Sequence, residues 1–259
     1  MLKLFEHPLS PYVQKVKLAL LEKGIPFTTE IPDILAGGGA EFAATNPRLE
    51  IPALVDGDVK IFDSTIILEY LEDKWPTPAM LPATPAERAR VRMIEEICDT
   101  YYEAINWALY EIRVFQRATG ALADALLARA GEQIAGVNTR LERELAGRDY
   151  FNGAAFGWGD LSVFPAVNAA DFSGFAPPPG SALAAWLERV RGRASVQQVL
   201  KAAAESMAGF GNLPQLIESG HFVREYRDHR LEWMMRSGGA QIVLDGISKR
   251  NIRFSVELG

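Results

Sequence analysis

Asp63 and Ser64 are the first residues whose types and position suggest chemistry. They stand directly before a run of apolar residues at helical spacing, and both are residues that cap a helix well. The first amide groups of a helix carry partial positive charge, so with a hydroxyl beside them they form a natural binding position for a carboxylate. Ser10, directly before Pro11 and a second helical pattern, offers another hydroxyl at a helix start. A plain helix cap is the alternative for each of them.

The segment before the Asp-Ser pair predicts a β-hairpin. Two apolar runs flank Asp56-Gly57, a pair that readily takes the positive φ values of a tight turn. The first strand opens with Pro52, which cannot donate to a strand ladder and suits a strand start, where a cis peptide bond is tolerated. The backbone of the neighbouring Ile51 could therefore pair with a short peptide whose carboxylate lies at the following helix start.

The composition is that of an ordinary soluble globular protein of one or two domains, because 48% of the 259 residues are hydrophobic and 23% are charged. The net charge of -6 argues against nucleic acid as a partner. No stretch approaches about 18 uninterrupted apolar residues, and the N-terminus does not resemble a signal peptide, so we expect a cytoplasmic protein without a membrane partner. The single cysteine, Cys98, forms no internal disulfide and no metal cluster, and we expect a buried thiol.

Hydrophobic periodicity predicts alternating strands and helices up to residue 75 and mostly helices beyond it. The first part comprises a strand at 2–4, a helix at 11–23, a strand at 27–31, a short helix at 41–44, the hairpin, and the helix that begins at Ser64. Four prolines between residues 76 and 85 prevent regular helix and mark a linker. Helices are then expected at 86–117, 122–145, 182–191, 196–206, 221–235 and 240–247, and an edge strand at 252–256.

Ile51-Pro52, the hairpin and Asp63-Ser64 together resemble the thioredoxin-like domain of the soluble glutathione transferases. Ser10-Pro11-Tyr12 is similar to the start of the first helix in the tau-, zeta- and omega-like classes, in its serine version. The resemblance covers about residues 1 to 210. It implies a thioredoxin-like α/β domain at 1–75, a linker at 76–85, an all-α domain at 86–212 and a C-terminal extension at 213–259.

Residues 151–160 resemble a family segment in which a hydroxyl residue caps a buried helix and an aspartate follows three positions later. This chain keeps the aspartate, Asp160. Gly157 stands where serine or threonine is commoner, although glycine is itself an acceptable cap.

The resemblance also implies an activity, that of a glutathione S-transferase in detoxification, usually a homodimer, with glutathione as co-substrate and no metal. Ser10 would donate a hydrogen bond to the sulfur and stabilise the thiolate, with Tyr12 as a rival hydroxyl. The backbone at Ile51 and Pro52 would pair with the cysteinyl unit. Asp63 would bind the α-amino group and Ser64 the carboxylate of the γ-glutamyl end.

The thiolate would attack a small hydrophobic electrophile by conjugation, displacement or ether cleavage. In this family the electrophile pocket is built largely from the helical domain, and Tyr12, Tyr101, Tyr102 and Trp107 could line it. Packing in the helical core is the alternative for most of these aromatic side chains.

Glu50 and the long C-terminal extension depart from the family pattern. Family members often carry a hydrogen-bond donor for the glycyl carboxylate at the position of Glu50, and Arg48 or Lys60 could replace that donor here. The aromatic residues of 213–259 are expected to cover part of the electrophile pocket. Both features favour an alternative reading, a glutathione-transferase-like binding or regulatory protein without turnover.

Overall fold

A computed structural model describes residues 1–33, 38–209, 213–219, 229–249 and 251. Contacts divide the chain into two compact units, one formed essentially by residues 1–211 and the other by 212–258, and each is described by itself. Within the described ranges, no helix combines the length and the apolar character needed to cross a membrane.

The first unit begins with a four-stranded mixed sheet in the order β2-β1-β3-β4. Its elements are β1 (Leu2–Phe5), α1 (Pro11–Glu22), β2 (Phe27–Glu30), α2 (Ala40–Thr45), β3 (Ala53–Asp56), β4 (Val59–Phe62) and α3 (Ser64–Lys74). Strand β1 pairs in parallel with β2 and antiparallel with β3, and β3 pairs antiparallel with β4. This is the thioredoxin-like arrangement that the sequence predicts.

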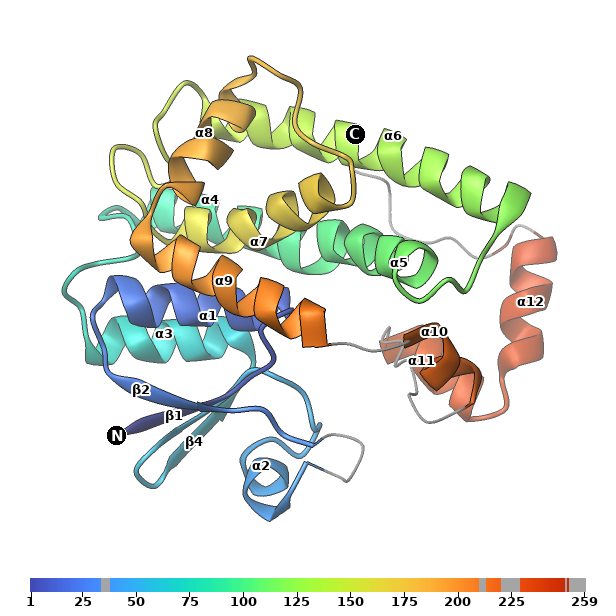
Figure 1. Cartoon of the computed structure of the whole chain (residues 1–259), viewed down its shortest axis with the longest axis horizontal. Helices are drawn as coiled ribbons and strands as arrows, with labels where there is room; N and C mark the ends of the chain where they lie inside the picture. The colour runs from blue at the N-terminus through green and yellow to red at the C-terminus, as the bar shows by residue number, and fades with distance from the viewer. Residues whose placement is uncertain (34–37, 210–212, 220–228, 250, 252–259) are drawn as a thin grey trace. The chain divides into compact units, whose positions relative to one another are not determined.

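Both faces of the sheet are apolar, and the side chains of each strand point alternately to one face and to the other. Leu4 and Leu54 belong to the main core together with apolar residues of α1 and α3. Helices α1 and α3 cover one face of the sheet (Figure 1). Phe5 and Ala53 instead form a small second core with Phe42 of α2. Helix α1 also packs against α7 and α9, so it lies between the sheet and the helical part of the unit.

The helical part of the first unit begins at Pro85, after residues 75–84, which contain no helix or strand. Its elements are α4 (Pro85–Glu96), the π-helical turn η2 (Ile97–Tyr102), α5 (Glu103–Arg113), α6 (Gly120–Leu145), α7 (Trp158–Phe172), α8 (Ala182–Arg191) and α9 (Ala194–Gly209). The predicted helix over 86–117 is therefore interrupted by a wider turn and ends four residues early. The predicted domain boundaries remain predictions.

The hairpin turn lies one residue later than predicted. Asp56 is still a strand residue and pairs with Val59, so the turn consists of Gly57 and Asp58. Gly57 has the positive φ, 62°, that such a turn needs. The carboxylate of Asp56 accepts a hydrogen bond from the Tyr70 hydroxyl (2.7 Å), which ties the hairpin to α3.

Gly157 caps α7 in the absence of a hydroxyl, as predicted, and a neighbouring side chain supplies the missing acceptor. Asn152 Oδ1 accepts from the amide of Gly159 (3.0 Å), and Asn152 Nδ2 donates to the carbonyl of Met80. A Cβ atom at residue 157 would lie 2.4 Å from that carbonyl oxygen and 1.9 Å from Asn152 Nδ2. Asp160 completes the cap by accepting from the amide of Gly157 (3.0 Å).

The second unit contains α10 (Leu213–Glu218), α11 (His229–Arg236) and α12 (Ala240–Ser248). The predicted helix over 221–235 is described only from His229 onward, and the predicted strand over 252–256 lies outside the described residues. The idea that this extension covers part of a pocket remains a prediction.

Candidate functional site

Three segments that carry the predicted site residues converge at one end of the sheet. Phe5, the last residue of β1, pairs with Ala53, the first residue of β3, and Ala53 also pairs with Phe62, the last residue of β4. The chain after β1 leads to Ser10, the chain before β3 contains Ile51-Pro52, and the chain after β4 opens α3 at Asp63-Ser64. The strand register therefore brings these positions to the same edge.

Ser10 is the N-cap of α1, and Pro11 occupies the first helical position, as predicted. The Ser10 hydroxyl oxygen accepts a hydrogen bond from the amide of Val13 (3.4 Å). Because the oxygen acts as an acceptor in this bond, the hydroxyl proton remains available for a second bond. The side chain is half-buried, so a bound ligand can reach it.

Tyr12 uses its hydroxyl proton elsewhere. Its oxygen lies 2.7 Å from the backbone carbonyl of Asp99 in η2, to which it donates. The ring is half-buried and connects the first turn of α1 to the helical part of the unit. This geometry makes Tyr12 a contact between layers and leaves Ser10 as the better-placed donor.

The backbone around Pro52 has the predicted conformation. The Ile51-Pro52 peptide bond is cis, Pro52 is buried, and Ile51 is half-buried beside it at the edge described above. The peptide-binding role of this backbone remains a proposal.

Asp63 and Ser64 form the start of α3. Asp63 is exposed, and its carboxylate accepts from the amides of Thr65 (3.0 Å) and Ile66 (3.3 Å). Its φ of 73° is unusual for a residue with a Cβ atom, and strained backbone of this kind gathers at ligand sites. Ser64 is buried and is the first residue of α3, so its own amide and hydroxyl lie at the helix start.

Glu50 is paired with Arg48. The guanidinium of Arg48 contacts one carboxylate oxygen through Nη2 (3.0 Å) and Nε (3.1 Å). The backbone carbonyl of Glu50 accepts from the side chain of Asn46 (2.7 Å). Arg48 and Lys60, the two residues suggested as replacement donors, are both exposed.

A buried ion cluster beside the site was not expected from the sequence. Lys15 lies between the carboxylates of Glu95 and Asp99, and its side chain is 1% exposed. Burial raises the pKa of Asp99 to about 6, against the opposing effect of Lys15, and the nearby charge of Asp63 also raises it. Two carboxyl groups thus share one ammonium group beside the start of α3.

The four aromatic residues proposed for the electrophile pocket have different surroundings. Tyr102 is completely buried and donates to Asn138 Oδ1 (2.8 Å), so it belongs to the helical core and offers a ligand no surface. Tyr101 and Trp107 are half-buried. The hydroxyl oxygen of Tyr101 is buried and finds no hydrogen-bond partner among the described residues.

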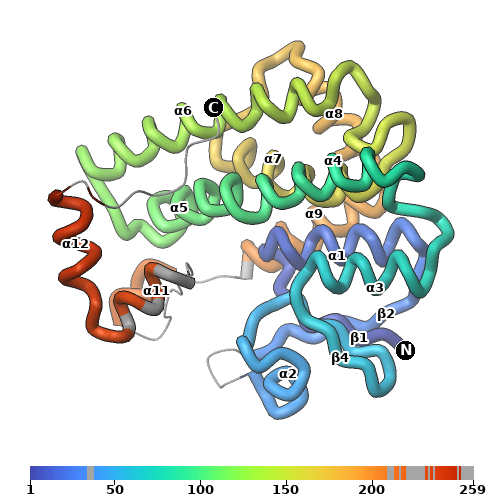
Figure 2. Tube along the Cα trace, turned by 180° about the vertical axis from the view of Figure 1, so that it is seen from behind, coloured from blue at the N-terminus to red at the C-terminus, as the bar shows by residue number. Residues whose placement is uncertain are grey.

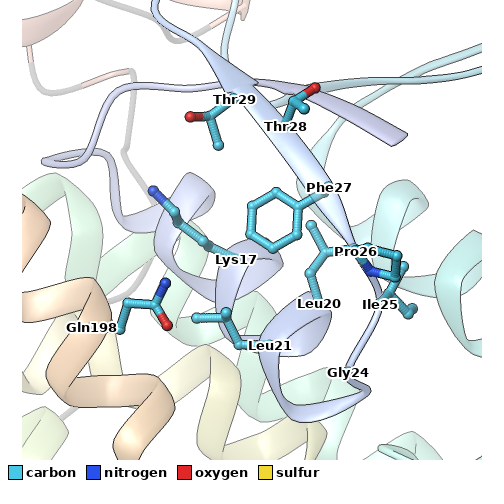
Figure 3. Close-up of a pocket in the computed structure, with 10 residues that line it drawn as sticks. All are labelled: Lys17, Leu20, Leu21, Gly24, Ile25, Pro26, Phe27, Thr28, Thr29 and Gln198. Carbon is cyan, nitrogen blue, oxygen red and sulfur yellow. The ribbon is translucent and has the colours of Figure 1, made fainter. Parts of the chain in front are cut away.

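A groove of about 660 Å³ lies away from these residues, between α1, β2 and α9 (Figure 3). Leu20, Leu21 and Phe27 form its apolar wall, and Lys17 and Gln198 are among its polar residues. None of the predicted site residues lines it, so it is separate from the candidate site.

Comparison with known proteins identifies the class of protein. Residues 4–79 match the N-terminal domain of glutathione S-transferases, and residues 124–189 match their C-terminal domain. The chain is 31% identical to glutathione S-transferase 3 of Zea mays over 212 residues, which are 78% of this chain and 94% of that protein. It therefore belongs to the glutathione S-transferase family, whose fold it has.

Two further relatives show the range of the family. A rice glutathione S-transferase solved in complex with glutathione has a TM-score of 0.66 and 27% identity, covering 76% of this chain and 90% of that one. A stringent starvation protein A homologue of Coxiella burnetii is 37% identical over 92 residues, which are 35% of this chain and 43% of that protein. The relatives of this chain thus include proteins named as glutathione transferases and proteins named as stringent starvation proteins.

Proposed function

We propose that this protein is a serine-type glutathione transferase. The observation that carries the proposal is the convergence of the Ser10 helix cap, the backbone of Ile51-Pro52 and the start of α3 at one end of the sheet. The similarity to a rice relative solved with glutathione supports the choice of ligand. The proposed setting is the cytoplasm, and the proposed role is detoxification.

In the proposed reaction, glutathione lies along Ile51 with its γ-glutamyl carboxylate at the start of α3. Asp63 binds the α-amino group, and Ser64 the carboxylate. The thiol loses its proton to solvent, and Ser10 donates a hydrogen bond to the resulting thiolate, while the α1 start adds partial positive charge. The sulfur electron pair then forms a bond to a small hydrophobic electrophile, which either adds a proton or releases a leaving group.

Retention on immobilised glutathione followed by turnover tests this proposal. The expected result is elution by free glutathione and conversion of at least one member of a panel that contains an aryl halide, an enone, an epoxide and an aryl ether. Retention without turnover of any member supports the second candidate, a binding protein, which the pairing of Arg48 with Glu50 favours. Absence of retention and turnover contradicts both candidates.

The pairing of Arg48 with Glu50 should weaken binding of the glycyl carboxylate of glutathione. Glu50→Gln removes a carboxylate that repels the ligand and releases Arg48, so binding should tighten by about two- to fivefold, the range of a partly exposed ion pair. Calorimetry measures the change. Arg48→Gln is the matched variant and should weaken binding, and equal affinities in both variants and the wild type would place this pair outside the site.

The family resemblance implies a homodimer, and helices α3 and α4 offer an exposed face on which two copies of the chain could meet. Ile66 on α3 is 56% exposed and Met93 on α4 is 61% exposed, and the ion pair between Arg92 and Glu69 joins the same two helices. We propose a homodimer formed through this face.

Met93→Glu should therefore convert the dimer to a monomer, as measured by light scattering. Leu122→Glu is the control, because Leu122 is 62% exposed on α6, outside the proposed interface. A wild-type protein that is already monomeric would contradict the proposed dimer, and a dimer that only Leu122→Glu separates would place the interface on another face.

A further inference from the structure

The ion cluster around Lys15 joins the two helix starts of the candidate site. Lys15 lies on α1, five residues after the Ser10 cap. Its ammonium group contacts Asp99 of η2 and lies 2.5 Å from Glu95 Oε1 of α4. It also donates to the hydroxyl of Thr65 on α3 (3.3 Å), the residue directly after Ser64.

Two further bonds close the cluster. The Thr65 hydroxyl donates to Glu95 Oε1 (2.8 Å), and the indole nitrogen of Trp158 on α7 donates to Glu95 Oε2. Helices α1 and α3 lie side by side in Figure 2, next to the layer that contains α4 and α7. A single buried cation is thus bonded to α3, α4 and η2 at once, and through Glu95 to α7.

These bonds bear directly on the geometry of the site. The main chain of Thr65 is itself held by Asp63, whose carboxylate accepts from its amide (3.0 Å). A shift of Lys15 therefore moves the start of α3 as well as α1. Small displacements of this kind matter, because misplacing a reacting group by about 1 Å can lower a rate by about a hundredfold.

We propose that Lys15 is a positioning residue of the transferase site. Through Thr65 and its two carboxylate partners, it keeps the start of α1 at the distance from the start of α3 at which Ser10 meets the sulfur of a bound glutathione. This inference rests on the proposed function. Lys15 itself touches neither the ligand nor the reacting atoms.

The chain offers a matched control on the same helix. Lys17 is also a buried cation of α1, and both carboxylate oxygens of Glu6 lie close to its ammonium group (2.6 and 2.7 Å). Removing either lysine leaves a buried carboxylate without its partner and destabilises the protein. Of the two lysines, only Lys15 is bonded to α3 and to the helical part of the unit. If both lysines only stabilise the fold, their removal should have similar effects on catalysis; if Lys15 positions the site, its removal should have the larger effect.

The experiment compares Lys15→Met, Lys15→Arg and Lys17→Met with the wild type. The readouts are the KM for glutathione, kcat with a saturating electrophile, and the pKa of the bound thiol from its thiolate absorbance. Lys15→Met should raise the KM about fivefold or more and raise the pKa of the thiol, whereas Lys17→Met should leave both within about twofold. Lys15→Arg should restore most of the loss, because it retains the charge.

Equal responses of the two methionine variants, or no response to either, would overturn the inference while the proposed function stands. If Lys15→Met does not fold, Thr65→Val takes its place, since it removes the link to α3 and leaves the ion pairs intact; a KM within about twofold of the wild type would then overturn the inference. A wild-type protein that shows no thiolate titration at all would overturn the proposed function and this inference with it.

Discussion

Ser10→Ala is expected to raise the pKa of the glutathione thiol by about 1 to 2 and to lower turnover near neutral pH by about tenfold or more. A hydrogen bond to a charged group contributes about 1.5 to 3 kcal/mol, and each pKa unit corresponds to about 1.36 kcal/mol. The hydroxyl proton of Ser10 is available for this bond, because among the residues that the structure describes its oxygen serves as an acceptor, for the amide of Val13. Affinity for glutathione should change little, since other residues bind the peptide.

Tyr12→Phe is the control. The Tyr12 hydroxyl donates to the carbonyl of Asp99, so its loss should leave the thiol titration in place and affect turnover only mildly. Raising the pH should restore part of the activity of Ser10→Ala, because the thiolate returns as the pH approaches the higher pKa. If the titration moves in Tyr12→Phe and stays unchanged in Ser10→Ala, the tyrosine carries the role and the serine-type assignment is wrong.

Asp160→Ala is expected to lower the free energy of unfolding by about 3 kcal/mol or more. Asp160 is completely buried and accepts from the amide of Phe151 (2.9 Å), the amide of Gly157 (3.0 Å) and the indole nitrogen of Trp186 (2.7 Å). Each buried donor left without a partner costs about 1 to 3 kcal/mol. Urea denaturation measures the loss.

Asp149→Ala is the matched control, because the Asp149 side chain is 68% exposed and its ion pair with Arg189 should contribute less than about 1 kcal/mol.

The pH dependence of stability tests which protonation state of Asp160 the folded protein prefers. Burial raises the pKa of Asp160 to about 6, above the value of about 3.9 in an unfolded chain, so the folded protein binds this proton more tightly. The contribution of Asp160 to stability should therefore grow as the pH falls from 8 to about 5. A contribution that shrinks over this range would show that the charged form is the one the fold prefers.

Local signals were sufficient to predict the elements of the sheet and the caps of the site. Ser10 caps α1 and Asp63 caps α3, because each cap depends on one or two residues and their immediate neighbours. The cis bond before Pro52 was implied by the family resemblance, since the local sequence only tolerates it. The predicted turn was misplaced by one residue because aspartate is common in turns. Here Asp56 is the last residue of β3, and its side chain bonds to Tyr70 of α3.

The ion cluster could not be predicted, because it depends on residues far apart in the chain. Lys15, Glu95 and Asp99 each sit on a helix where a charged side chain ordinarily faces solvent, and only the packing of α1 against the helical part of the unit brings them together. The π-helical turn at 97–102 was missed for a related reason. Apolar residues three or four apart fit a regular helix equally well, so the pattern does not reveal the extra residue in the turn.

The cap of α7 has a consequence for how this sequence can change over evolutionary time. Gly157 and Asn152 form one unit: a side chain at residue 157 would collide with the Met80 carbonyl and with Asn152, and loss of Asn152 would take away the acceptor for the Gly159 amide. Neither position can change alone toward a hydroxyl cap without passing through a less stable intermediate. The two residues are therefore expected to be inherited together, and a motif search that demands serine or threonine at the cap would overlook descendants that fold in the same way.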